Sequence, residues 1–146
     1  MSTRGGAVLY TPEVLALAVE LAEHPLVEGL AQRGEAVSRV CGSKVTIVLS
    51  TDAGGAVKAI GARVSACAIG QAAAALFVRE ARGRDAGAIA AALEAIEAWL
   101  GGAEELPAWP GITRLEAARA YPARHAAILL PWRAGLAALS NPAPAG

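Results

Sequence analysis

The chain has 146 residues, of which 55% are hydrophobic and 18% charged, and its 13 basic residues balance its 13 acidic ones. This length predicts one domain that can bury a core of its own without disulfides or metal ions to hold it. The zero net charge argues against a nucleic-acid partner, because binding to phosphates needs clustered Lys and Arg side chains.

Membrane and export segments are not expected either. The longest charge-free stretch within the expected fold, residues 64–78, is shorter than the roughly 20 apolar residues that a membrane span needs. Behind Arg4, the apolar run contains Pro12 and Glu13, which do not fit the core of a signal peptide. We therefore expect a cytoplasmic protein without a membrane partner.

The first half of the chain predicts one helix and three strands. A helix is expected over residues 12–23, because Thr11 can cap it and apolar residues then repeat at helical spacing until Pro25. Alternating apolar residues predict a strand over 45–50, and turn residues separate it from an extended run over 56–65. A third antiparallel strand over 35–40 would precede it, turning at Cys41 and Gly42.

The second half predicts three more helices. The first is expected over residues 67–82, and the second runs from its capping residue Asp85 to about Leu100. The third is expected from Pro122 to about Leu139, with an interruption at Pro131. This order predicts an α+β fold in which a small three-stranded antiparallel sheet carries helices on one face. Residues 1–140 would form the single domain and 141–146 a flexible tail rich in Pro and Ala.

The two cysteines are the residues of the sequence that most clearly suggest a chemical function. Cys41 is expected in a turn between strands, and Cys67 where a strand passes into a helix, whose N-terminus stabilises a thiolate. Thiolates bind iron or zinc and attack persulfides, but cysteine is also one of the residues most often buried as an inert side chain. The spacing alone leaves both interpretations open.

Five short segments, in this order, resemble the IscU/NifU/SufU-type iron–sulfur cluster assembly scaffolds. They are Leu9-Tyr10-Thr11 with Val14 and Leu15; Val40-Cys41-Gly42; Cys67-Ala68-Ile69 with Ala72, Ala74 and Leu76; Arg82-Gly83-Arg84-Asp85; and Pro122-Ala123-Arg124 with Trp132 and Ala134. The resemblance covers nearly the whole chain, and the fold it implies agrees with the predicted order of elements.

The resemblance implies a site for a [2Fe–2S] cluster or a zinc ion, held by three cysteines and an acidic residue. Cys41 and Cys67 match the first two cysteines, whereas Ser43 stands at the acidic position and Ala127 at the third cysteine. One branch of the family carries a histidine just before the third cysteine, and here His125 lies one residue ahead of that position. The implied metal ligands are therefore Cys41 and Cys67, with Ser43 and His125 as candidate additional ligands.

His125 has a second interpretation, as a surface histidine in the first turn of the last helix. Ala127 is expected to face the same pocket as Cys41 and Cys67, and the two thiols are expected to lie close together.

The leading interpretation is a scaffold or accessory protein of iron–sulfur cluster assembly, not an enzyme. It would bind iron, a transient [2Fe–2S] cluster or zinc, and would act with a cysteine desulfurase and the assembly machinery. A homodimer would be one way to supply the missing ligands. The alternatives are a docking partner that holds no stable cluster, and an acceptor of persulfide sulfur on Cys67 or Cys41.

Overall fold

The computed structural model describes residues 9–141, and every structural statement below refers to these residues. The elements, in chain order, are α2 (Pro12–Glu20), the 3-10 helix η1 (Leu21–Glu23), β1 (Gln32–Val37), β2 (Lys44–Thr51), β3 (Val57–Ser65), α3 (Ala68–Glu80), α4 (Ala86–Leu100), the 3-10 helix η2 (Ile112–Ala120) and α5 (Pro122–Ser140).

The three strands form one antiparallel sheet in the order β1-β2-β3. In the central strand, Ile47 lies opposite Gly34 of β1 and Ala62 of β3. The alternating residues Val45, Ile47 and Leu49 are completely buried, so this side of β2 faces the core, as the sequence pattern predicts. The α+β fold class is confirmed.

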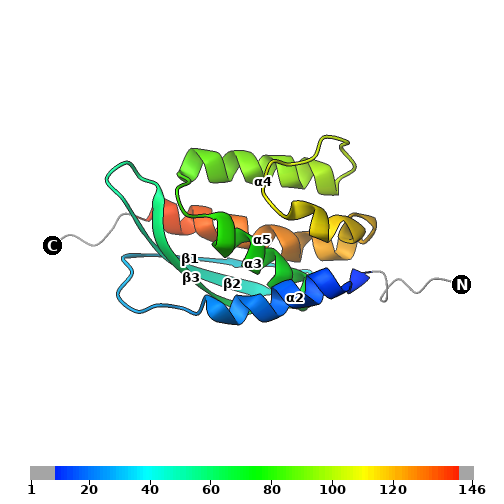
Figure 1. Cartoon of the computed structure of the whole chain (residues 1–146), viewed down its shortest axis with the longest axis horizontal. Coiled ribbons are helices and arrows are strands. Elements are labelled where there is room, and N and C mark those ends of the chain that lie inside the picture. The colour runs from blue at the N-terminus through cyan, green and yellow to red at the C-terminus, as the bar shows by residue number, and fades with distance from the viewer. Residues whose placement is uncertain (1–8, 142–146) are drawn as a thin grey trace, which may run out of the picture.

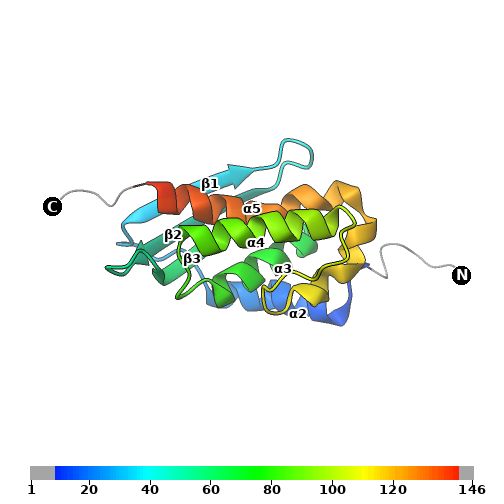
Figure 2. The same cartoon turned by 90° about the horizontal axis from the view of Figure 1, so that it is seen from above.

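Helices α3 and α5 pack on the inner face of the sheet, with α3 over β3 and α5 over β1 and β2. Helix α2 lies beside α3, and α4 packs on α5 on the side away from the sheet (Figures 1 and 2). The helices thus form two layers over one face of the sheet. None of the helices in the described part of the chain is long and apolar enough to cross a membrane.

Two glycines allow α5 to approach its neighbours closely. A Cβ atom on Gly34 of β1 would lie 2.3 Å from the carbonyl oxygen of Ala134 and from the amide nitrogen of Ala138, so β1 and α5 meet backbone to backbone. Gly135 makes room in the same way for the ring of Phe77 from α3. This contact fixes the position of α5 against the sheet.

An aromatic cluster fills the space between α3, α5 and the loop before η2. Phe77 stacks on Trp109 at a centroid distance of 5.6 Å, and the ring of Trp132 meets both of them edge-on. The indole nitrogen of Trp109 donates to the carbonyl oxygen of Leu76 at 2.9 Å, which ties the loop to α3.

The structure differs from the sequence-based expectation in three elements. Strand β1 begins and ends three residues earlier than the expected 35–40, because Ser38 already belongs to the turn. Residues 112–120 form a 3-10 helix that the sequence analysis did not predict. The last helix runs without a break through Pro131, from Pro122 to Ser140.

The end of α5 is fastened to the sheet. The side-chain nitrogen of Gln32 donates to the carbonyl oxygens of Ala138 and Asn141, and the Asn141 side chain donates to the carbonyl oxygen of Arg33. Asn141, the first residue of the expected tail, is therefore bonded to β1. The remainder of that tail, residues 142–146, lies outside the described residues.

Candidate functional site

Cys41 lies in the turn that connects β1 to β2. The amide of Ser38 donates to the carbonyl oxygen of Ser43, and the amide of Gly42 donates to that of Ser38, both at 2.8 Å. Gly42 has a φ angle of +75°, which glycine adopts without the strain that a side chain would cause. The turn thereby leaves the side chain of Cys41 exposed to solvent.

Two serine hydroxyl groups lie against the sulfur of Cys41. The Cys41 Sγ atom is 3.4 Å from Ser38 Oγ and 3.1 Å from Ser43 Oγ. Hydrogen bonding with Ser38, and then with Ser43, holds the pKa of the Cys41 thiol below its ordinary value, because both hydroxyl groups can donate to the sulfur once it is a thiolate. Cys41 therefore combines solvent exposure with a lowered thiol pKa.

Cys67 is the residue that precedes the first turn of α3. Its extended backbone carries the chain from the end of β3 into the helix, and its carbonyl oxygen accepts the amide hydrogen of Gln71 at 2.9 Å. The Gln71 side chain also donates to the carbonyl oxygen of Ala66 at 2.9 Å, which fastens the strand-to-helix connection. Cys67 is half-buried and, like Cys41, is not part of a disulfide.

One hollow brings the two cysteines together. It has a volume of about 300 Å³, and its walls come from the β1–β2 turn, the connection into α3 and the start of α5. The residues that line it are Cys41, Gly42, Ser43, Ser65, Ala66, Cys67, Ala123, Arg124 and Ala127. Ala127, which is 1% exposed, lines the same hollow as the cysteines, as its register on the last helix predicts.

Ser43 and His125 occupy different places relative to this hollow. Ser43 lines it, but its hydroxyl group is hydrogen-bonded to the Cys41 sulfur. The Nε2 atom of His125 lies 3.1 Å from the carbonyl oxygen of Ala118 and 3.2 Å from that of Arg119, so it donates to the end of η2. His125 lines another hollow, beside Leu100 and Arg119, and does not line the hollow of the two cysteines.

The donor set of the hollow can be tested against an iron–sulfur cluster or a zinc ion. Both are usually held by four protein ligands, mostly thiolates or imidazoles. Within residues 9–141, no group of three or more His, Cys, Asp or Glu side chains is arranged to hold a metal ion. The two cysteines therefore make half of such a site, and Ala127 adds no donor.

Arg124 is a lining residue that the sequence analysis did not single out as part of the site. It lies three positions before Ala127 on α5, so both residues point to the same side of the helix. This spacing of three residues from Ala127 is the sequence signal that could have identified Arg124 as part of the site. Its guanidinium group has neither a hydrogen bond nor an ion pair to any other residue between 9 and 141, and the residue adds a positively charged side chain to the lining of the hollow.

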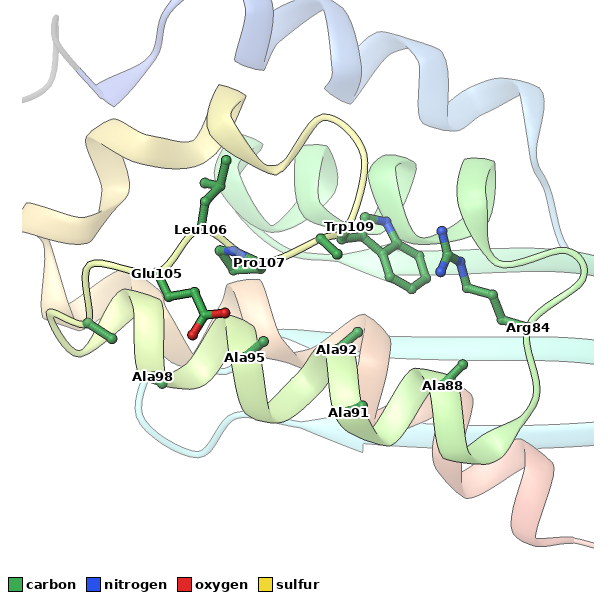
Figure 3. Close-up of a pocket in the computed structure, with 12 residues that line it drawn as sticks. Arg84, Ala88, Ala91, Ala92, Ala95, Ala98, Glu105, Leu106, Pro107 and Trp109 are labelled. Atoms are coloured by element: carbon green, nitrogen blue, oxygen red, sulfur yellow. The ribbon is translucent and has the colours of Figure 1, made fainter.

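A second hollow, of about 390 Å³, lies between α4 and the loop that precedes η2. Figure 3 shows alanine side chains of α4 facing the loop that carries Leu106, Pro107 and Trp109. The Arg84 guanidinium lies 4.4 Å from the centre of the Trp109 ring at one end, and Glu105 lines the other. None of the residues that line this hollow carries a thiol or an imidazole.

Solved structures with the same fold were found by comparison. The N-terminal part of a nitrogen-fixing NifU-like protein from Brucella abortus is 29% identical, with a TM-score of 0.79, over 93% of this chain and 95% of that chain. A putative iron–sulfur cluster assembly scaffold protein for the SUF system from Fervidobacterium islandicum AW-1 is 22% identical, with a TM-score of 0.80, over 90% of this chain and 97% of that chain.

A third structure, of a hypothetical protein, shares the fold at 17% identity and a TM-score of 0.67, over 88% of this chain and 97% of that chain. A scan against models of protein families found no match, and a search of curated proteins found none. The resemblance recognised in the sequence is confirmed by the structural neighbours, which cover about nine-tenths of the chain.

Proposed function

We propose that this chain, a divergent member of the IscU/NifU/SufU-type scaffold family, carries iron, a [2Fe–2S] cluster or zinc as cargo on Cys41 and Cys67. One observation supports the proposal most: the turn after β1 and the start of α3 present the two thiols to a single hollow. The role is that of a non-catalytic scaffold or accessory protein, and its expected partner is a cysteine desulfurase in the cytoplasm.

The proposed cargo would be held loosely. Two thiolates leave open coordination positions at a tetrahedral ion, and open positions are typical of reactive metal sites, whereas structural sites are closed. The missing ligands must come from water, a small thiol, Ser43 or His125 after rearrangement, or a second copy of the chain. Loose binding suits a protein that passes its cargo on.

Reconstitution without oxygen tests this proposal. The protein is incubated with ferrous iron and sulfide, or with zinc, and the bound metal and the visible absorption are measured before and after a chelator is added. We expect the parent chain to bind iron and sulfide, and to lose them to the chelator. The Cys41→Ser and Cys67→Ser variants should bind less, and the double variant serves as the metal-free control.

Two results would count against the proposal. If the parent chain bound no more metal than the double variant, the cysteines would not be a metal site. If the cluster survived the chelator, further protein ligands would have to complete the site and the cargo would not be loosely held.

A second candidate function is acceptance of persulfide sulfur by Cys41. The observation that favours it is the exposed Cys41 thiol, whose pKa is lowered by hydrogen bonding with Ser38 and Ser43. The Cys41 thiolate would attack the outer sulfur of a desulfurase persulfide. A bond forms between the two sulfurs, the bond to the sulfur of the enzyme cysteine breaks, and that cysteine leaves as a thiolate, so no external oxidant or reductant is needed.

Mass spectrometry after incubation with a cysteine desulfurase and free cysteine tests this second function. We expect the chain to gain one sulfur atom on Cys41, and the Cys67→Ser variant to gain it as well. A gain that persists in Cys41→Ser, or no gain in the parent chain, would exclude Cys41 as the acceptor.

A further inference from the structure

Two further residues of the hollow matter here: Ala127, which offers no metal ligand, and Arg124, whose positive charge is not paired with another described residue. Ala127 occupies the place where a third donor would point at the cargo, and its methyl group offers none. Arg124 lines the same hollow from the same face of α5, without a hydrogen bond or ion pair to the rest of residues 9–141. Such an arginine is suited to an anionic partner that comes from outside the chain.

The chemistry of the two features restricts what that partner can be. An iron or zinc ion that already has two thiolates is best completed by a further soft ligand, such as a thiolate. Arginine presents a planar fork of N–H donors that matches a carboxylate with two parallel hydrogen bonds, and it is less strongly hydrated than lysine. A hollow of about 300 Å³ is at the small end of the range for small-molecule sites.

We propose that the hollow binds a small thiol that carries a carboxylate group, with its sulfur beside Ala127 and its carboxylate on Arg124. Free cysteine and the tripeptide glutathione both have this chemistry. The proposal rests on the proposed function for its biological meaning, because the thiol would complete the coordination of the cargo. The carboxylate site itself exists with or without metal and can be tested in its absence.

The metal-free test uses two disulfide reagents that react with the same thiol and differ in charge. 5,5′-Dithiobis(2-nitrobenzoate) carries carboxylates, whereas 4,4′-dithiodipyridine is uncharged. In each case the Cys41 thiolate attacks one sulfur, forms a mixed disulfide and releases the other half as a thiolate or its thione, which is followed by absorption. The reactions are measured in a Cys67→Ser background, so that only Cys41 responds.

We expect Arg124→Gln to slow the carboxylate reagent at least threefold more than the uncharged one. Arg82→Gln, at an exposed position outside the hollow, is the matched control and should leave the ratio of the two rates unchanged. Equal slowing with both reagents would mean that Arg124 only favours the thiolate of Cys41. That result, or no change with either reagent, would overturn the proposal.

The second test places the thiol at the metal, with cobalt(II) as the spectroscopic probe. We expect 3-mercaptopropionate to tighten cobalt binding at least fivefold more than 2-mercaptoethanol does, and Arg124→Gln to abolish the difference. Ala127→Cys should bind cobalt without any added thiol. Glutathione and free cysteine, added separately, show which source fits better, and the uncharged thiol acting as well as the others would overturn the carboxylate site.

The failures of the two proposals are distinguishable. If neither the parent chain nor Ala127→Cys bound cobalt, the metal function would fail, and the disulfide reagents would still decide on the carboxylate site. If both bound cobalt and the reagents showed no charge preference, the metal function would stand and the carboxylate site would fail.

Discussion

The hydroxyl groups of Ser38 and Ser43 lower the pKa of the Cys41 thiol. Because they stabilise the charged form, removing either one should raise the pKa of Cys41, with the larger effect for Ser38. At pH 7, Ser38→Ala and Ser43→Ala should therefore slow the reaction of Cys41 with iodoacetamide, while the rates converge at a pH well above the pKa. The pH dependence of the alkylation rate in a Cys67→Ser background measures this.

Ser65→Ala is the matched control for the serine variants. Ser65 lines the same hollow, but it forms no hydrogen bond with the Cys41 sulfur. Its rate profile should coincide with that of the parent, and a shift as large as that of Ser38→Ala would mean that the hydrogen bonds are not the cause.

Ala127 marks the position where one substitution should add a third donor to the proposed metal site. A cysteine there adds a third thiolate to Cys41 and Cys67, so Ala127→Cys should raise the affinity for zinc at least tenfold, or ~1.4 kcal/mol. Ala126→Cys is the matched control, because it adds the same thiol one residue away, at a position that does not line the hollow. Competition with a zinc indicator measures the affinity. Equal affinities for the two variants would show that the hollow does not gather the three thiols.

The residues of the site were only partly predictable from the sequence. Cys41 and Cys67 could be recognised because thiols are rare and their neighbours resemble those of a known family. Ser38 could not be recognised, because its contact with Cys41 depends on how the turn folds back between residues 38 and 43. The position of His125 depends on η2, whose last carbonyl oxygens hold the imidazole away from the cysteines.

At the scale of elements, the contact between β1 and α5 depends on the absence of a side chain at residue 34. A Cβ atom there would lie 2.3 Å from two backbone atoms of α5. The end of a flexible side chain could move away from such a contact, but the backbone of a packed helix cannot. We expect Gly34→Ala to lower the free energy of unfolding by about 1–3 kcal/mol or more, as overpacking does. Unfolding in urea, followed by circular dichroism, measures it.

Gly87→Ala is the control for this prediction. Gly87 lies in the first turn of α4, and an added Cβ atom there would meet only the Asp85 carboxylate oxygen at 3.6 Å. Because alanine favours the helix over glycine, this variant should keep or raise the stability by up to about 1 kcal/mol. A Gly34→Ala variant as stable as Gly87→Ala would mean that β1 and α5 can separate at no cost.

The predicted elements that proved correct were those with local signals. The Thr11 side chain accepts the amide hydrogen of Val14, and the Asp85 side chain that of Ala88, as capping residues do. The helix over 112–120 was missed although Ile112, Leu115 and Ala118 are buried at intervals of three, which is the period of a 3-10 helix. A search for helical spacing of 3.6 residues passes over that pattern.

The predicted bounds of strand β1 were three residues too late, and no local sequence pattern contains the reason. Gln32 begins the strand as a buried polar residue, because its side chain bonds to the end of α5 more than a hundred residues away. Such a long-range partner becomes visible only when the whole chain is folded.

At the scale of the whole molecule, the proposed cargo would join the β1–β2 turn directly to the start of α3. Cys41 lies in the turn between β1 and β2 and Cys67 precedes α3, so an ion shared by both thiols would stabilise the folded chain over the unfolded one. With zinc at about a hundred times its dissociation constant, the gain should be ~2.7 kcal/mol, less any binding to the unfolded chain. Thermal unfolding with and without zinc measures it, and Cys41→Ser should show no gain. An equal gain in that variant would place the zinc elsewhere.

The position of α4 has a consequence for how the molecule opens. This helix forms the outermost layer and packs mainly on α5, whereas α5 lies between α4 and the sheet (Figure 2). Amide protons of α4 should therefore exchange with deuterium through a local opening that detaches one helix, while those of the buried strand β2 should exchange only when the whole domain unfolds. The chain would then have a hierarchy of opening free energies, in which the outer helix can detach from α5 while the central strand of the sheet stays paired.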